Sequence, residues 1–402
     1  AVITGTLDNP AAASDIAKDK EAYDDDGNKL TGTLQVDPPE PPEPEKKDVN
    51  FYRYDGRRMY SYTLAEVQAL TELPALPTLQ NHVFQWNWTL AGLKTHGAKA
   101  NVGAYGCIQG YMSSFTLEVP EDTYLTVSIK ATTSTMVGAY WYGDEDHEYD
   151  YGYASNNAPF TATHKYTAGK YELVVFGMNN LTIEFGYNTI VKIADFSQYH
   201  DFNSLSGNYC ANLKYMIGGN MPTGFGGPGL EFYITPPNKS TGISLNGMVS
   251  LRRVCFGEGY KLYTNYYGWA DCRALEEIYV STQTSAPVTY YNNAALGLKG
   301  LKDFYIPAPS YGTDFMRECA SLGYVKIAEG VASIDGRSFN SCTAIQVVEF
   351  PSTLTSLNGF TSGLNGLLKV VFKSSTPPTV AGSNVFGGSS FASRANAKII
   401  VP

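Results

Sequence analysis

Six cysteines are the residues of this 402-residue chain best suited to cross-linking or to binding a metal ion. The chain has no Cys-x-x-Cys pair and no Cys/His spacing typical of a zinc site. Four of the six each precede an aliphatic residue by three positions, namely Cys210, Cys272, Cys319 and Cys342. We therefore expect these four to be reduced, buried and stacked in register as small hydrophobic residues, and we expect no metal and no cofactor.

Residues that could carry out catalysis form no recognised motif. The five histidines are scattered singly, and the sequence has no nucleophile elbow, no His-Glu-x-x-His and no phosphate-binding loop. The glycine-rich segment 224–229 contains Pro228 and suits a surface loop. Carboxylates in segments 24–28 and 144–148 could hold a cation, but a hairpin turn and a solvated loop are simpler interpretations. We therefore expect no catalytic residue.

Composition predicts a mainly β, multi-domain chain. Charged residues make up only 17%, whereas tyrosine occurs 30 times and glycine 39 times, and long helical patterns are missing. A net charge of -9 and a pI near 5.1 argue against binding nucleic acid, which needs a basic surface. No apolar run is long enough to span a bilayer, so we expect no membrane insertion.

A repeat in the second half explains the cysteines. Apolar residues return three and five positions after each aliphatic anchor, as Val348 and Phe350 do after Ile345, and this period of two indicates a strand. The intervals between anchors are 24, 26, 21, 23 and 22 residues, within the range of leucine-rich repeats. The anchors are Leu251, Leu275, Leu301, Leu322, Ile345 and Leu367.

The motif around 339–352 resembles the BspA-like leucine-rich repeats of bacterial surface proteins and their phages. Phenylalanine is followed by Ser-Cys-Thr-Ala-Ile and then by Val-Val-Glu-Phe-Pro-Ser. The resemblance implies a solenoid over residues 201–402, in which each repeat contributes one strand and a return segment.

The N-terminal part contains a shorter repeat. Ile3-Thr4-Gly5-Thr6-Leu7 recurs as Leu30-Thr31-Gly32-Thr33-Leu34, so residues 1–36 read as short tandem units. These units resemble repeats of phage tail and minor structural proteins. Residues 37–48 are rich in proline and are expected to form an extended linker.

Two further modules are expected before the solenoid. Residues 49–95 resemble the Listeria–Bacteroides surface repeats, which implies a β-grasp-like fold, and Thr63 with Glu66 predicts a helix start. Residues 96–200 contain closely spaced strand patterns that suggest a β-sandwich. Their His164-Lys165-Tyr166 hairpin pattern resembles polycystic-kidney-disease (PKD)-like domains, although Glu145 replaces a usual glycine.

Strand alternation then predicts a binding face. If the positions three and five after each anchor point inward, those two and four after it point outward. Tyr279, Tyr305 and Tyr324 would form an aromatic strip there, flanked by outward positions such as Cys255 and Glu277. The alternative is that these tyrosines only pack against one another. A second candidate is the loop carrying Tyr266, Tyr267 and Trp269.

Together these resemblances imply a non-enzymatic virion structural protein. We expect a tail fibre of a bacteriophage, located on the virion tail outside the cell, that serves in host attachment. Its partners would be a bacterial surface receptor, either glycan or protein, and other tail proteins, and it would form a homo-oligomer, most plausibly a trimer. The alternatives are a bacterial cell-surface adhesin built from the same modules and a tailspike that cleaves glycans.

Overall fold

The computed structural model is mainly β and divides into two units, Ala1–Glu43 and Pro44–Pro402. In the first unit, β1 (Glu21–Tyr23) pairs antiparallel with β2 (Lys29–Thr31), and the intervening segment 24–28 lies outside the described residues. No described helix is long and apolar enough to cross a membrane. The structure describes residues 21–23, 29–31, 41–79, 82–106, 112–142, 149–177, 181–185, 191–196, 204–205, 213–218, 229–238, 245, 247–260, 271–281, 297–312, 315–334, 338–358, 364–381, 391 and 396–402.

The second unit begins with what we call the N-terminal module, residues 44–106. Its four-stranded sheet has the order β4-β3-β6-β5, with β3 parallel to β6. Because β6 lies between β3 and β5, this sheet extends beyond residue 95, where the sequence suggested a boundary. The expected capping box is present, since Thr63 accepts from Glu66 N and the Glu66 side chain accepts from Thr63 N. The elements are β3 (Val49–Tyr52), β4 (Arg58–Tyr62), α1 (Leu64–Ala69), β5 (Gln85–Trp86), α2 (Leu90–His96) and β6 (Ala100–Tyr105).

Residues 112–205 form two facing sheets, which we call the two-sheet domain. One sheet contains β10-β9-β12-β7-β14 and the other has the order β11-β8-β13-β15. Phe115 and Phe185 meet between the sheets, with ring centroids 4.8 Å apart. The five strands predicted from the sequence, at 115–119, 125–129, 136–142, 171–176 and 181–185, are present, and four more complete the two sheets. The nine described strands are β7 (Met112–Val119), β8 (Thr123–Ala131), β9 (Thr135–Tyr142), β10 (Tyr149–Ala154), β11 (Phe160–Tyr166), β12 (Gly169–Gly177), β13 (Leu181–Phe185), β14 (Val191–Phe196) and β15 (Ser204–Leu205).

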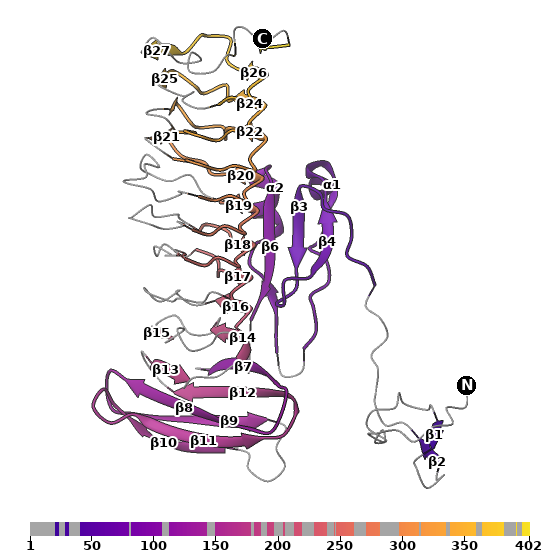
Figure 1. Ribbon diagram of the computed structural model, residues 1–402, viewed down its shortest axis with the longest axis vertical. Coiled ribbons are helices and arrows are strands. Elements are labelled where there is room, and N and C mark those ends of the chain that lie inside the picture. The colour runs from indigo at the N-terminus through magenta and orange to yellow at the C-terminus, as the bar shows by residue number, and fades with distance from the viewer. Residues whose placement is uncertain are drawn as a thin grey trace. The chain divides into compact units, whose positions relative to one another are not determined.

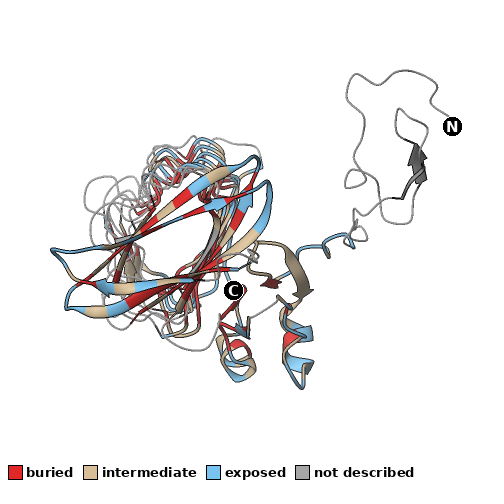
Figure 2. Cartoon of the chain, turned by 90° about the horizontal axis from the view of Figure 1, so that it is seen from below, coloured by how far each residue is buried: buried red, intermediate tan, exposed pale blue. Residues whose placement is uncertain are grey.

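Burial in this domain follows the period of two that a half-buried strand requires. Buried and more exposed residues alternate along β8 and β11, as Figure 2 shows by colour. Trp141 is fully buried, stacks on His164 at 5.0 Å, and donates from Nε1 to Asp150 Oδ2 at 2.8 Å. The inner faces of the two sheets therefore share one core.

A strand stack, residues 213–402, continues directly from this domain (Figure 1). β14 pairs antiparallel with β7 on one side and parallel with β16 on the other, so the sheet of the two-sheet domain runs on into parallel strands. Those strands are β16 (Tyr215–Gly218), β17 (Phe232–Ile234), β18 (Arg253–Cys255), β19 (Glu277–Tyr279) and β20 (Asp303–Tyr305).

Two further parallel sheets follow in the stack. The strands of the first are β22 (Tyr324–Lys326), β24 (Val347–Phe350), β26 (Lys369–Phe372) and β28 (Lys398–Ile400). The return segments form the second, with β21 (Ser310–Tyr311), β23 (Ser333–Ile334), β25 (Ser356–Asn358) and β27 (Thr379–Ala381). Equivalent repeat positions pair, as Tyr324 does with Val347. From 251 onward, each interval between anchors thus contributes a strand, as the anchor spacing predicts.

The positions three and five after each anchor were predicted to point inward, and all of them are buried except Phe372, which is half-buried. Three residues after each anchor lie Val254, Ile278, Phe304, Val325, Val348 and Val370, and all are buried. The anchors are buried as well, and Cys272, Cys319 and Cys342 lie beside them in the same core. Each layer therefore buries its apolar edge against the next.

Candidate functional site

The three tyrosines predicted to form a binding strip differ in how far they are exposed to solvent. Tyr324 is 42% exposed, Tyr305 is half-buried, and Tyr279 is only 4% exposed. Tyr266, Tyr267 and Trp269 lie outside the described residues. The three tyrosines do not form one exposed strip, and the expectation of an accessible Tyr279 is wrong. Cys255 and Glu277, also expected at the surface, are fully buried.

The N-terminal module is what covers this part of the stack. An apolar cluster joins the two, and its buried members are Tyr52, Tyr105, Ile217, Phe232, Ile234 and Cys255. Gly103 on β6 lies so close to Ile234 that a Cβ at this glycine would be 2.6 Å from Ile234 Cγ2. The outward face over β17 and β18 is therefore an internal interface.

Hydrogen bonds from Asn87 and Trp88 fix the same interface. The buried Asn87 Nδ2 donates to the carbonyls of Thr235 and Cys255 at 2.9 and 3.0 Å, and its Oδ1 accepts from Gly103 N at 2.8 Å. Trp88 Nε1 donates to the carbonyl of Phe256 at 2.9 Å. The contacts with Thr235, Cys255 and Phe256 bring together residues more than 140 positions apart, which no local pattern encodes.

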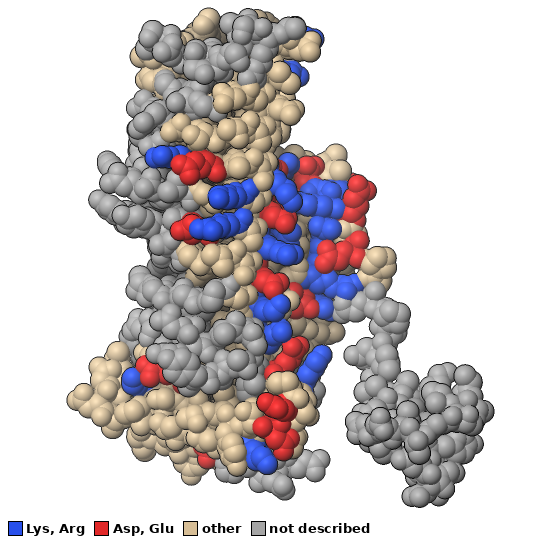
Figure 3. Space-filling model, in the orientation of Figure 1, with Lys and Arg blue, Asp and Glu red and all other residues tan. Residues whose placement is uncertain are grey.

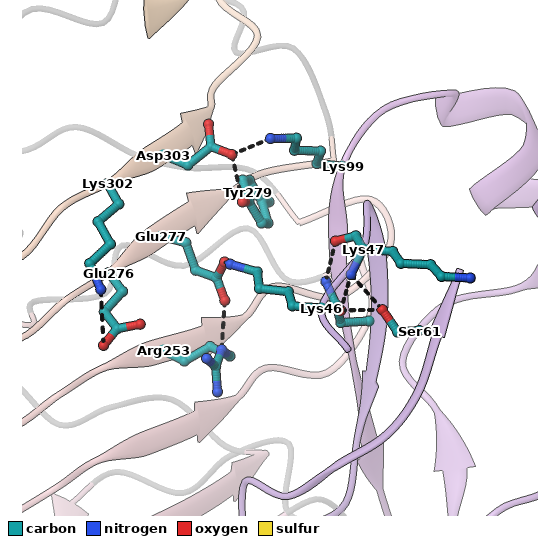
Figure 4. A network of polar contacts seen from close by, with 11 residues as sticks. Lys46, Lys47, Ser61, Lys99, Arg253, Glu276, Glu277, Tyr279, Lys302 and Asp303 are labelled. Carbon is teal, nitrogen blue, oxygen red and sulfur yellow. Dashed lines mark hydrogen bonds and ion pairs between the residues drawn. The ribbon is translucent and has the colours of Figure 1, made fainter. Parts of the chain in front are cut away.

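A charged network lies at the edge of this interface (Figure 4). Glu277 Oε1 accepts from Arg253 Nε at 2.6 Å, and its other oxygen is bound by Lys46. Asp303 Oδ2 accepts from the Tyr279 hydroxyl at 2.9 Å and from Lys99. Each of the two carboxylates thus bridges the stack and the module.

The electrostatic interactions in this network favour the ionised form of Glu277. Burial raises the pKa of Glu277, but Arg253 and Lys46 outweigh it, so the pKa lies below its ordinary value. The pKa of Tyr279 is raised, first by burial and then by the charges of Glu277 and Asp303. An ionised carboxylate bound by two cations is a poor proton carrier at neutral pH. The geometry of Glu277 therefore suits a structural link between the stack and the module better than acid–base catalysis.

The cysteines also take structural positions. Cys255, Cys272, Cys319 and Cys342 are free and buried, which confirms the expected burial for three of the four repeat cysteines, while Cys210 lies outside the described residues. The Cys342 thiol donates to Met316 O at 2.7 Å, and the Cys272 thiol donates to Leu245 O at 2.8 Å. Burial raises the pKa of Cys272 to about 12, so its thiol stays protonated near neutral pH.

Among the described residues, no three His, Cys, Asp or Glu side chains are grouped so that they could hold a metal ion. Segment 144–148, where the sequence left a cation open, lies outside these residues.

A group of tyrosines on the two-sheet domain, all exposed except the half-buried Tyr140, was missed by the sequence reasoning. We call it the tyrosine surface, and its members are Tyr140, Tyr142, Tyr149, Tyr151 and Tyr153 on β9 and β10. Their exposed fractions reach 63% at Tyr151 and 74% at Tyr153. The signal was available, because the tyrosines alternate along 149–153 and again at 140 and 142, which places them on one face of a sheet.

Figure 3 shows that charged side chains gather over the N-terminal module and the adjoining stack, whereas the two-sheet domain presents a mostly uncharged surface in this view. Searches with the chain found no matching family model, no matching curated protein and no matching solved structure.

Proposed function

We propose that this chain is a structural and adhesive component of a bacteriophage tail fibre, located on the virion tail outside the cell. In this proposal residues 201–402 are a BspA-like leucine-rich-repeat solenoid that presents a receptor-binding surface. Three features support it: anchor intervals of 21 to 26 residues, parallel pairing of equivalent positions, and a core of repeat residues. The short tandem repeats in residues 1–36 favour a virion over a cell-surface adhesin.

We base the receptor site on one observation, which is that the exposure of the outward-facing residues changes along the stack. The outward residues of β18 and β19 are covered by the N-terminal module, whereas Tyr324 and Lys326 on β22 are exposed. Next to them, Val347 and Glu349 on β24 are half-buried. We place the contact with a host-cell receptor, glycan or protein, on β22, β24 and β26, because tyrosine beside mixed charge suits recognition.

The remaining modules have supporting roles in this proposal. A repeat stack needs a cap on its terminal layers, and the two-sheet domain, a PKD-like sandwich in our proposal, caps the first layer through β14 and β16. The N-terminal module, proposed as a β-grasp-like surface repeat, braces layers β17 to β20. In this proposal the chain binds other tail proteins and forms a trimer with copies of itself.

Mass spectrometry of purified virions tests the assignment, since peptides of this chain should be recovered in fixed ratio to other tail proteins. Recovery only from intact bacterial cells would establish the adhesin alternative instead. A glycan-cleaving tailspike is the third possibility, and release of reducing ends from a capsule would reveal it.

A competition assay tests the receptor face. The purified chain should inhibit adsorption to host cells, and the variant Tyr324→Ala with Lys326→Ala should inhibit it at least about tenfold less well. Tyr124→Ala is the matched control, because Tyr124 is 69% exposed but lies on β8 of the two-sheet domain, outside the proposed receptor face. Equal inhibition by both variants would place the receptor site elsewhere.

A further inference from the structure

The tyrosine surface is a group of exposed aromatic side chains on two neighbouring strands. Tyr142, Tyr149, Tyr151 and Tyr153 are 41%, 50%, 63% and 74% exposed, and Met136 beside them is 51% exposed. Single exposed apolar residues are common, but a contiguous group of them marks a binding surface.

The rings are held in place by one another. Tyr149 stacks on Tyr151 with centroids 5.9 Å apart and an interplanar angle of 27°, and Tyr140 stacks on Tyr142 at 6.0 Å and 29°. Tyr140 also contacts Tyr149 at 5.8 Å, which joins the two pairs across the strands. Rings fixed in this way lose little conformational entropy when a ligand binds.

Buried contacts join the strands below the rings. Asp150 lies between two of the tyrosines in sequence and accepts from the fully buried Trp141, which holds β10 against β9. Phe176 on β12 lies over Gly138, where a Cβ would come within 2.4 Å of the ring, so the aromatic layer continues onto the third strand. Tyr140 contacts Phe176 at 5.1 Å.

The position of the module leaves this surface open. Its His82 contacts Ser114 Oγ at 3.0 Å and Glu172 Oε1 at 3.5 Å, on strands β7 and β12 of the same sheet. Beyond that contact, the tyrosines of β9 and β10 keep the high exposures given above. The covered and open parts of one sheet face thus lie side by side.

We propose that the tyrosine surface binds a neutral polysaccharide, whose sugar units contact the tyrosine rings and hydroxyls. This inference stands independently of the tail-fibre assignment and of the receptor face on β22 to β26. Tyrosine side chains supply no cationic group to bind an acid, so a neutral ligand fits better than an acidic one. Each tyrosine combines an apolar ring with a hydroxyl, which suits a sugar's C–H face and its hydroxyl groups.

The chemistry of the surface favours a glycan over a second copy of the chain. Tyrosine is also common in protein interfaces, but the described residues of this surface contribute Met136 as the main aliphatic side chain, and the tyrosine hydroxyls add polar groups that suit a sugar. Along β10 the tyrosines recur every second residue on one face, and the ring centroids of Tyr149 and Tyr151 lie 5.9 Å apart, so neighbouring rings can meet neighbouring sugar units of an extended chain.

Affinity electrophoresis of the full chain tests the proposal, with a glucan, a mannan or a galactan cast into native gels and hyaluronan as an acidic comparison. At least one neutral polysaccharide should retard the chain. The double variant Tyr149→Ala with Tyr151→Ala should bind at least about tenfold more weakly, while Tyr124→Ala should bind like the wild type. Circular dichroism verifies folding, and the single variant Tyr153→Ala serves if the double variant misfolds.

Three outcomes would overturn the proposal. The first is no retardation by any neutral polysaccharide, and the second is equal retardation of the wild type and the folded tyrosine variants. The third is a concentration-dependent dimer in sedimentation that the tyrosine variants abolish, because this would make a second copy of the chain the occupant of the surface.

Discussion

The carboxylate of Glu277 and the guanidinium of Arg253 form an ion pair between neighbouring layers of the stack, with Nε and Oε1 2.6 Å apart and the Glu277 side chain fully buried. Lys46 of the N-terminal module binds the other oxygen of the same carboxylate. One residue therefore links two layers of the stack to the module that covers them.

Replacing Glu277 by alanine should destabilise the chain by about 3 to 5 kcal/mol, because Arg253 would remain largely buried without its partner. Glu276→Ala is the matched control. Its ion pair with Lys302 is longer, at 3.8 Å, and lies at the surface, so its loss should cost less than about 1 kcal/mol. Urea unfolding measures both, and equal losses would show that Glu277 is solvated.

The pH dependence of stability follows from the same carboxylate. The pKa of Glu277 in the folded chain lies below its ordinary value, so its contribution is present above that ordinary value and is lost as the pH falls through the folded pKa. The stability difference between wild type and Glu277→Gln should therefore shrink from about pH 7 to about pH 3. A difference that grew on acidification would mean that Glu277 is protonated in the folded state.

Asn87 should be essential to docking of the N-terminal module. Asn87→Leu would leave the carbonyls of Thr235 and Cys255 without their donor, at about 1 to 3 kcal/mol for each buried group. Asn101→Leu is the control, since Asn101 is equally buried on β6 and its amide has no hydrogen-bond partner among the described residues. Thermal unfolding should show a large loss for Asn87→Leu and a small change for Asn101→Leu. The reverse order would contradict the interface.

Ile345→Ala tests the repeat register. Ile345 is a fully buried anchor, and the change should cost about 2 to 5 kcal/mol through lost burial and the cavity it leaves. Val249→Ala is the control, because Val249 is 43% exposed in another repeat. A loss below about 1 kcal/mol for Ile345→Ala, measured by urea unfolding, would place this anchor at the surface.

The sequence predicted the features that neighbouring residues determine, but it did not predict those that depend on residues far apart in the chain. Inward positions such as Val348 were predictable because a period of two and a regular interval fix them locally. The burial of Tyr279 was not, because its partner Asp303 also binds Lys99 of the N-terminal module, a contact that only the tertiary fold creates. The tyrosines at 149, 151 and 153 carried a readable alternation, and their importance becomes clear only when β9 places Tyr140 opposite Tyr149.

Chemical labelling of the tyrosines in the native chain, read out by mass spectrometry, tests most directly which faces are covered and which are open. The account predicts rapid labelling of Tyr151, Tyr153 and Tyr324 and slow labelling of Tyr279, because the N-terminal module covers only the last of these. Tyr233 and Tyr311, each nearly inaccessible, set the slow reference. Labelling of Tyr279 as fast as that of Tyr324 would contradict the covered face, and protection of Tyr151 and Tyr153 would contradict the open tyrosine surface.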